Sequence, residues 1–453
     1  MRATLYTAPW VLPVSAPPLS AAAVLVDGDG RIAWLGPAAE APAAESAARV
    51  DLDGCALLPG LVNAHAHPEL AAFRGLLEDL PFHQWIPTLR RTRLADPLTA
   101  DDLRDAALWS CAESLAAGVT CTGATEDSDA SLRAFSSCGM RGVAYREVFG
   151  PDPGHAARAL EVVRARIEGM RALESSLVRV GISPHAPYTV CDELYRGAAT
   201  LAADQELPLA VHAAEAEAEA LLVTRGAGPF AAGLRTRGIA TPPRARSPIE
   251  LLARTGVLAR APLVIHAVRI DATDIAQLAS AGASIAHCPI ANARLGHGIA
   301  PVVEAAARGV NVALGTDSVA SNNRIDLLEE ARVAQLLQRA RLHSAGALGA
   351  AELLRMATLC GARALGFGDV IGTLEPGRDA DLCAVRLDTV HGRPVHDPLA
   401  TLFFAARGSD VVLTVVRGRV LYRDASWPTI DMPALAARVE TIGARVRLAR
   451  ARS

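Results

Sequence analysis

The chain has 453 residues, of which 51% are hydrophobic and 21% charged, a balance typical of a folded globular protein and not of a disordered one. Its formal net charge of -3 excludes a strongly basic surface for nucleic acid or for an anionic membrane, so we expect a small-molecule partner. All 45 positive charges are arginine, because the sequence contains no lysine. This excludes Schiff-base lysine chemistry and any pair of metal ions bridged by a carboxylated lysine.

The cysteine pattern and the apolar runs suggest where the protein resides. The eight cysteines are scattered, without a C-x-x-C pair or disulfide-like spacing, as expected in a reducing cytosol. No apolar run reaches the roughly 18 residues of a membrane span. Prolines at positions 9, 13, 17 and 18 interrupt the apolar N-terminus, which argues against a cleaved signal peptide. We therefore expect a cytoplasmic protein.

Residues 1–56 predict a small β element. Strands are expected at residues 4–11, 23–27 and 31–35, and the D-G-D-G sequence between the last two is a strong hairpin signal. These strands precede a longer region with a different pattern.

Residues 57–368 alternate between strands and amphipathic helices. After a first strand that ends near His65, strands are expected at residues 119–123, 142–148, 178–182, 209–213, 263–268, 283–287 and 311–314. Helices are expected between them, for example at residues 101–116, 155–173, 192–203, 272–281 and 324–341. Eight β–α units in one domain indicate an α/β fold, a closed parallel (β/α)8 TIM barrel.

The alternation stops after residue 368. Residues 370–377, 380–386 and 411–422 are strand-like and rich in turns, and we expect them to join residues 1–56 in a small β-sandwich formed by both chain ends. A last helix is predicted at residues 433–448. The predicted division is thus 1–56 and 369–430 for the sandwich, 57–368 for the barrel and 431–453 for the C-terminal helix.

The stretch LLPGLVNAHAHPEL, residues 57–70, ends an apolar strand with two histidines. His65 and His67 are two residues apart, so on a strand both imidazoles point to the same face. Imidazole is a common zinc ligand, and a catalytic zinc needs three protein ligands and an open position for water. The other ligands must come from elsewhere in the chain.

Barrel enzymes build their active sites at the C-terminal ends of the strands. Polar residues recur at the ends of nearly all the later predicted strands: His185, His212, Glu215, His266, His287 and Asp317. Each alone has a structural explanation, such as a core histidine or an aspartate that caps a helix. Their recurrence at one level of the barrel predicts a metal site.

The motifs PGLVNAHAH, SPHAPYTV, HAAE, IHAV, HCPIAN and LGTDSVASNN, followed by IGTLEPGRDADL, resemble those of the amidohydrolase superfamily, in its cytosine-deaminase-like and nucleoside-deaminase-like branch. The resemblance covers nearly the whole chain. It implies one divalent metal ion, Zn²⁺ in first place with Fe²⁺ or Mn²⁺ as alternatives, held by His65, His67, His212 and Asp317. Three imidazoles and a carboxylate suit zinc or Fe(II).

The resemblance also implies catalytic roles. A metal can lower the pKa of a bound water to about 7, and Asp317 would accept the proton of that water. His266 would orient the water and polarise the group attacked. Glu215 would protonate a ring nitrogen of the bound substrate and pass protons to the leaving amine. Glu217 and Glu219, the other acids of AAEAEAEA, are expected at the surface.

Several residues are candidates for substrate binding. His185 in SPHAPYT corresponds to a substrate-contacting histidine of the family. Trp85 and Phe82, in the loop after the first barrel strand, either stack on a planar base or pack within the loop. Arg146, at the end of the third strand, either reaches a substrate oxygen or neutralises Glu147.

Two features bear on the substrate. Deaminases of methylthioadenosine and adenosylhomocysteine usually offer a first-strand-loop glutamate to the ribose hydroxyls, and QWIPTLRRTR has no acid. HAHPEL, the loop around Trp85 and HAAEAEAEALLVTRGAGPF more closely resemble aminodeoxyfutalosine deaminases of menaquinone biosynthesis, which release ammonia from a 6-aminopurine nucleoside carrying a benzoate. Arg90 or Arg91 would pair with that carboxylate. HCPIAN has Ala291 where a serine is usual, which removes a hydroxyl contact.

The leading hypothesis is a hydrolytic deaminase of a 6-aminopurine nucleoside, with aminodeoxyfutalosine as the first candidate. Adenosylhomocysteine, methylthioadenosine or another nucleobase compound is the first alternative. A chlorohydrolase or a cyclic amidase on the same metal framework is the second. A metal-free regulatory or structural relative is the third, but such a protein should lack some ligands. Because the family often forms dimers, a homodimer is also expected.

Overall fold

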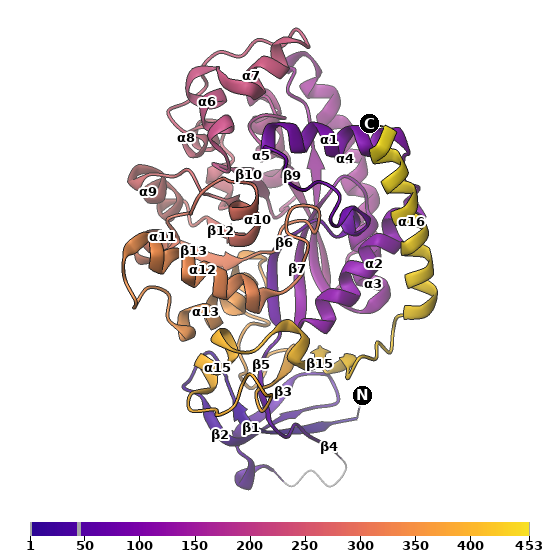
Figure 1. Cartoon of the computed structure of the whole chain (residues 1–453), viewed down its shortest axis with the longest axis vertical. Coiled ribbons are helices and arrows are strands. Elements are labelled where there is room, and N and C mark those ends of the chain that lie inside the picture. Colours follow the sequence, from indigo (N-terminus) through magenta and orange to yellow (C-terminus); the bar gives the residue numbers. More distant parts are fainter. Residues whose placement is uncertain (1, 43–46, 453) are drawn as a thin grey trace.

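The computed structural model describes residues 2–42 and 47–452. Figure 1 shows a barrel with its surrounding helices, a smaller β-sheet at one end of it, and the C-terminal helix along one side.

The barrel consists of two four-stranded parallel sheets whose strands follow the chain order. The first sheet contains β6 (Leu61–Ala66), β7 (Val119–Glu126), β8 (Arg141–Val148) and β9 (Val178–Pro184). The second contains β10 (Ala210–Ala213), β11 (Leu263–His266), β12 (Ser284–His287) and β13 (Asn311–Leu314). Single parallel bridges, Ile182 with Leu209 and Ala66 with Asp317, join the two sheets at both junctions. The predicted α/β barrel is confirmed, and each predicted barrel strand between residues 119 and 314 matches within three residues.

Helices connect the barrel strands, and further helices follow the last barrel strand. They are α1 (Phe82–Ala95), α2 (Ala100–Ala116), α3 (Ala130–Cys138), α4 (Ala156–Arg171), α5 (Asp192–Asp204), α6 (Glu217–Arg225), α7 (Gly228–Arg235), α8 (Pro248–Arg254), α9 (Ala272–Ser280), α10 (Pro289–Arg294), α11 (Val302–Ala307), α12 (Leu327–Leu342), α13 (Ala350–Ala357), α14 (Leu359–Ala364), α15 (Pro398–Phe404) and α16 (Met432–Arg452). Short 3₁₀ turns supplement them, among them η2 (Pro68–Phe73). Local signals fix several starts: Thr99 and Asp102 form a capping box at α2, and Asp271 and Asp274 form one at α9.

The smaller sheet has eight strands and unites the two chain ends. Its order is β16 (Arg419–Arg423), β15 (Val411–Val416), β14 (Leu382–Arg386), β5 (Cys55–Pro59), β1 (Thr4–Val11), β2 (Leu19–Val26) and β3 (Ile32–Pro37), and β4 (Ala48–Asp51) pairs with β1. The antiparallel pairing of β5 with β14 joins the N-terminal strands to the C-terminal ones. One apolar cluster consists mostly of residues of this sheet, so the sheet has a hydrophobic core of its own.

Two sequence predictions differ from the observed sheet. The boundary predicted between residues 56 and 57 falls inside β5, because the chain leaves the sheet only at Gly60. A Cβ atom at Gly60 would lie 2.2 Å from the side chain of Thr120, so only glycine fits this turn into β6. Residues 370–377 form turns and no strand. Gly372 has a φ of +95°, which interrupts an extended backbone.

A buried ion-pair group anchors the sheet to the N-terminal end of the barrel. The fully buried Arg141, at the start of β8, donates from Nε to Asp381 (2.9 Å) and from Nη2 to Asp379 (2.9 Å). The sheet therefore leaves the C-terminal ends of the barrel strands uncovered.

The C-terminal helix α16 packs against α1 and α2. Arg445 pairs with Asp102 (2.7 Å), and Ile442 and Val446 join an apolar cluster that includes Phe82 and Trp85 of α1. Helix α16 thus supports α1 from outside. None of the helices in the described ranges is both long and apolar enough to cross a membrane.

Candidate active site

The four predicted metal ligands meet at the C-terminal end of the barrel. Nε2 of His65 lies 3.2 Å from Oδ1 of Asp317, and Nε2 of His67 lies 3.6 Å from the same oxygen. The ring of His212 is centred 4.9 Å from that of His65 and 5.5 Å from that of His67. Three different strands, β6, β10 and β13, therefore bring these side chains into one space.

Backbone geometry and neighbouring polar groups hold this arrangement. Asp317 has a left-handed backbone (φ +58°), and its amide donates to the carbonyl of His65 (3.0 Å). The hydroxyl of Ser321 donates to Oδ2 of Asp317 (2.7 Å). Nδ1 of His212 lies 3.2 Å from the carbonyl oxygen of His185, so the Nδ1–H tautomer leaves Nε2 free to bind a metal ion.

The electrostatics of these residues fit a divalent metal ion. Burial and the neighbouring His65 lower the pKa of His67 to about 3, and burial also lowers the pKa of His212, so both imidazoles are neutral at pH 7. Burial raises the pKa of Asp317, but the hydrogen bond and charge of His65 outweigh it and hold that pKa below its usual range. Neutral imidazoles beside a carboxylate form a donor set suited to zinc or Fe(II). Nδ1 of His65 is buried without a hydrogen-bond partner.

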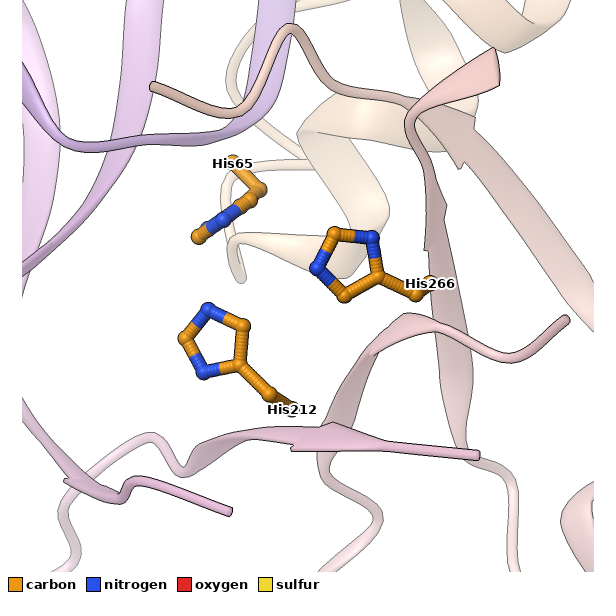
Figure 2. Close-up of side chains that lie close together, drawn as sticks. All are labelled: His65, His212 and His266. Atoms are coloured by element: carbon orange, nitrogen blue, oxygen red, sulfur yellow. The ribbon is translucent and has the colours of Figure 1, made fainter. Parts of the chain in front are cut away.

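His266 lies at the edge of this group. Figure 2 shows its ring facing those of His65 and His212, and one ring nitrogen from each lies within 4.8 Å of the others. Nδ1 of His266 lies 3.0 Å from Oδ1 of Asn292, which leaves Nε2 directed to Glu215, 3.5 Å away. His266 therefore contacts the predicted proton-transfer residue as well as the metal donors.

The Glu215 carboxyl is buried among three polar side chains. Tyr188 donates to its Oε2 (3.3 Å), while Nε2 of His266 and Nε2 of His297 lie 3.5 and 3.2 Å from its Oε1. Burial raises the pKa of Glu215, but the charge of His266 and the proximity of His297 outweigh it, and the pKa is lowered. Glu215 is thus an ionised acid placed next to imidazoles.

Glu219 differs from its predicted surface position. It is fully buried and accepts hydrogen bonds from the amides of Ala214 (2.8 Å) and Glu215 (2.7 Å). Ala214 has a left-handed backbone (φ +54°), so this contact stabilises the turn that directs Glu215 to the site. Glu217 is exposed, as predicted. The E-x-E-x-E alternation suggests one exposed face, but α6 begins at Glu217 and carries Glu219 back towards the barrel.

A cavity of about 740 Å³ opens from the metal donors to the surface. His185, Trp85 and Phe82 line it, and Trp85 and Phe82 also belong to a buried apolar cluster, so their contact with a substrate stays a prediction. Glu147 lines it in place of the predicted Arg146, because neighbouring side chains of a strand point to opposite faces. Arg90 lines the cavity, whereas Arg91 is not among its lining residues and donates to the hydroxyl of Thr88 (3.0 Å).

A second group of acids lies in the same cavity. We call Glu69, Asp127 and Glu147 the acidic cluster. Arg93 lies 2.9 Å from Asp127 and 3.4 Å from Glu69. Burial, with the charges of Asp127 and Glu69, raises the pKa of Glu147 well above its usual range. Oε1 of Glu147 is buried without a hydrogen-bond partner and lies 3.8 Å from Nε2 of His185.

Five residues of this site have no role in the sequence-based predictions: Glu69, Asp127, Glu147, Tyr188 and His297. Tyr188 lies within the motif SPHAPYT, and Glu69 within HAHPEL, so both were close to recognised positions. Glu147 enters the sequence-based prediction only as a partner of Arg146. His297, between two glycines in LGHGIA, had no strand-end position to identify it.

Comparisons with known proteins agree with this geometry. The family model described as "Amidohydrolase family" matches residues 56–421. The chain is 35% identical to a 5-methylthioadenosine/S-adenosylhomocysteine deaminase of Syntrophobacter fumaroxidans over 92% of each chain. An adenosine deaminase of Xanthomonas campestris with bound zinc has 30% identity and a TM-score of 0.84 over 98% of each chain. The atrazine chlorohydrolase of Arthrobacter aurescens in complex with zinc has 26% identity and a TM-score of 0.84, covering 97% of this chain and 100% of that one.

The family match spans most of the chain, and the barrel carries histidines and an aspartate suited to a divalent metal ion. The chain therefore belongs to the amidohydrolase family and is an enzyme that hydrolyses a carbon–nitrogen bond.

Proposed function

We propose that the protein deaminates a 6-aminopurine nucleoside that carries a substituent at the ribose 5′ position, with release of ammonia. The main support is the Glu215 carboxyl, which lies 3.5 Å from His266 beside the metal donors and in the cavity wall. This carboxyl suits proton transfer to a ring nitrogen. The similarity to a methylthioadenosine/adenosylhomocysteine deaminase supports the same class of substrate.

Different side chains would bind the metal ion, orient the water and transfer protons during hydrolysis. His65, His67, His212 and Asp317 would hold the metal ion, which activates water and polarises the reacting centre when bound. The ionised Glu215 takes up the first proton of the attacking water, which His266 orients, and gives it to the ring nitrogen next to the attacked carbon. Asp317 accepts the remaining proton of that water, which then passes to the amino group. Ammonia leaves, the attacked carbon becomes a carbonyl, and both carboxylates are again ionised.

The cavity walls fit a nucleoside. Phe82, Trp85 and Tyr188 offer aromatic surfaces to a planar base. Glu147 takes the place of the ribose-binding glutamate that QWIPTLRRTR lacks. Burial raises the pKa of this carboxyl and so favours its protonated form, and a protonated carboxyl both donates and accepts a hydrogen bond, as two neighbouring hydroxyls require.

The outer cavity indicates the 5′ substituent. Leu89, Leu94 and Leu98 line it beside Arg90 and Arg237. In the described part of the chain no carboxylate lies within 4.0 Å of either guanidinium, so both are available to a substrate anion. A substituent with an apolar stem and a carboxylate fits this region. Aminodeoxyfutalosine is therefore the first candidate substrate, which would place the enzyme in menaquinone biosynthesis, and adenosylhomocysteine is the second.

The test is ammonia release by protein loaded with zinc, iron or manganese. The substrates to compare are aminodeoxyfutalosine, adenosylhomocysteine, methylthioadenosine, 5′-deoxyadenosine and adenosine. We expect the highest kcat/KM for a nucleoside with a carboxylate in its 5′ substituent. Ammonia from none of them would contradict the proposed function. A cytoplasmic location and a homodimer stay predictions, to be measured by cell fractionation and by light scattering.

A second candidate is hydrolysis of another leaving group. The structural similarity to an atrazine chlorohydrolase favours it, because the same barrel accommodates that substrate. Chloride release from atrazine, with no ammonia from the nucleosides, would support this candidate.

A further inference from the structure

His297 is the one imidazole near Glu215 that the mechanism above does not use. It follows α10 and stands between Gly296 (φ +71°) and Gly298 (φ +108°). A side chain would find space at both glycines, so their role is the left-handed backbone that turns the chain. This turn buries His297, which is 3% exposed.

The position of His297 is coupled to that of His266 through Asn292. The amide of His297 donates to the main-chain carbonyl of Asn292 (2.8 Å), while the side-chain oxygen of Asn292 lies 3.0 Å from Nδ1 of His266. One residue of α10 therefore fixes both imidazoles that face Glu215. The ring of Phe82 packs edge-on against that of His297, with centroids 4.6 Å apart, and limits its movement.

Glu215 is the nearest hydrogen-bond partner that the structure offers to Nε2 of His297. This nitrogen lies 3.2 Å from Oε1 of Glu215, and it forms no hydrogen bond of regular geometry with any residue that the structure describes. A buried N–H without a partner is costly, so a small rotation that directs Nε2 to Oε1 is favoured. Tyr188 donates to the other oxygen of the same carboxyl. Together the two donors restrict rotation of the carboxyl about its terminal bond.

We propose that His297 is a positioning residue, which through its Nε2 holds the Glu215 carboxyl in the orientation from which a proton reaches the substrate ring. This inference rests on the proposed function, because it assigns Glu215 the proton transfer. His297 itself touches no substrate: it does not line the cavity and acts through Glu215.

The experiment is a double-mutant cycle measured by ammonia release. We expect His297→Leu to lower kcat about 10-fold to 100-fold with KM nearly unchanged, because substrate binding does not involve His297. In the Glu215→Gln background the same change should cause no further loss. Equal losses in the two backgrounds, or an unchanged kcat in His297→Leu alone, would overturn the proposal.

Two further variants separate positioning from folding. His297→Asn keeps an N–H donor and should recover at least part of kcat; if it is as slow as His297→Leu with normal metal content and normal thermal midpoint, the proposal fails. His391→Leu removes an imidazole whose Nε2 lies 2.7 Å from Asp410, in the segment after β14, and serves as the matched control with wild-type kcat.

A substrate-free measurement distinguishes the failure of this inference from that of the proposed function. A wild type that deaminates no nucleoside contradicts the function alone. The Glu215 carboxyl band, identified by infrared difference between wild type and Glu215→Gln, should then respond to His297→Leu by shifting its titration to higher pH. An unchanged titration would show that His297 does not contact the carboxyl in solution.

Discussion

The cavity contains two buried groups of carboxyls that differ in their partners. Glu215 lies among imidazoles, and its pKa is lowered despite burial. Glu147 and Glu69 lie among other acids with Arg93, and their pKa values are raised. One end of the cavity therefore favours the ionised form of a glutamate, and the other end favours the protonated form of two glutamates. The same residue type is thus suited to proton transfer at one end and, in the proposed function, to recognition of uncharged hydroxyls at the other.

Loss of a metal ligand should abolish both metal binding and catalysis. We expect His212→Ala to bind little metal and to lose more than about 10,000-fold in turnover, because three donors cannot replace four. Metal analysis by mass spectrometry and ammonia release measure both quantities. The exposed His396 supplies the control His396→Ala, and normal metal content in His212→Ala would show that the ligand set is misassigned.

Removing the proton-transfer acid should leave the metal site intact. Glu215→Gln is expected to retain metal and to lose about 100-fold to 10,000-fold in kcat, since a positioned acid or base contributes that much. Glu217→Gln changes an exposed acid two residues away and should behave as wild type. Retained activity in Glu215→Gln would remove this residue from its role.

A change at the recognition end should act on affinity and specificity. Glu147→Gln is expected to lower kcat/KM about 10-fold to 100-fold, mainly through KM, because a hydrogen bond to a buried polar group is worth roughly 1–3 kcal/mol. The variant should also discriminate less between a ribonucleoside and its 3′-deoxy analogue. Steady-state kinetics with both substrates measure this, and undiminished discrimination would argue against contact with the ribose.

The acidic cluster should make stability depend on pH. Burial and the charge of Asp127 raise the pKa of Glu69 from 4.5 to about 7, so the folded protein binds more protons than the unfolded one in this interval. The contribution of Glu69 to the free energy of unfolding therefore falls as pH rises from about 4.5 to about 7. Glu69→Gln cannot ionise, so its stability relative to wild type should be about 1–3 kcal/mol higher at pH 8 than at pH 4.5.

Urea unfolding at the two pH values measures this difference. The exposed Glu168 of α4 supplies the control Glu168→Gln, which should show no such gain. Equal effects of pH on the wild type and on Glu69→Gln would show that Glu69 is ionised across the whole range.

The smallest effect is expected at the cavity mouth. Arg90→Ala should raise KM about 3-fold to 10-fold for a nucleoside with a carboxylate in its 5′ substituent and leave KM for methylthioadenosine unchanged, because exposed ion pairs contribute little. Arg91→Ala is the matched control, since Arg91 lies outside the cavity lining. An equal change for both substrates would indicate a structural role for Arg90.

The strand ends explain why much of the site could be predicted from the sequence. A parallel barrel places the residue after each strand at the same level, so His65, His67, His212 and Asp317 could be grouped before any coordinates. The sequence predicts less reliably which face of a strand each residue occupies. Arg146 and Glu147 are neighbours on β8, and a difference of one residue decides which of them faces the cavity.

Residues outside the strand ends carry no comparable signal. His297 reaches Glu215 only through the turn made by two left-handed glycines, and Glu219 reaches the amide of Glu215 only because α6 begins where it does. Both contacts depend on tertiary packing. The break at Gly60 likewise depends on how closely Thr120 approaches, which no local pattern contains.

The pairing of β5 with β14 has a consequence for how the chain acquires its site during synthesis. Leu57 pairs with Ala384, and β5 continues after one residue into β6, which carries His65. The pairing with β14, which holds β5 and therefore the start of β6 in place, can thus form only after most of the chain has left the ribosome. Contacts so distant in sequence form slowly, because the long intervening loop must close first. A nascent chain therefore exposes its two N-terminal histidines well before Asp317 arrives, and metal capture is expected to be a late step of folding.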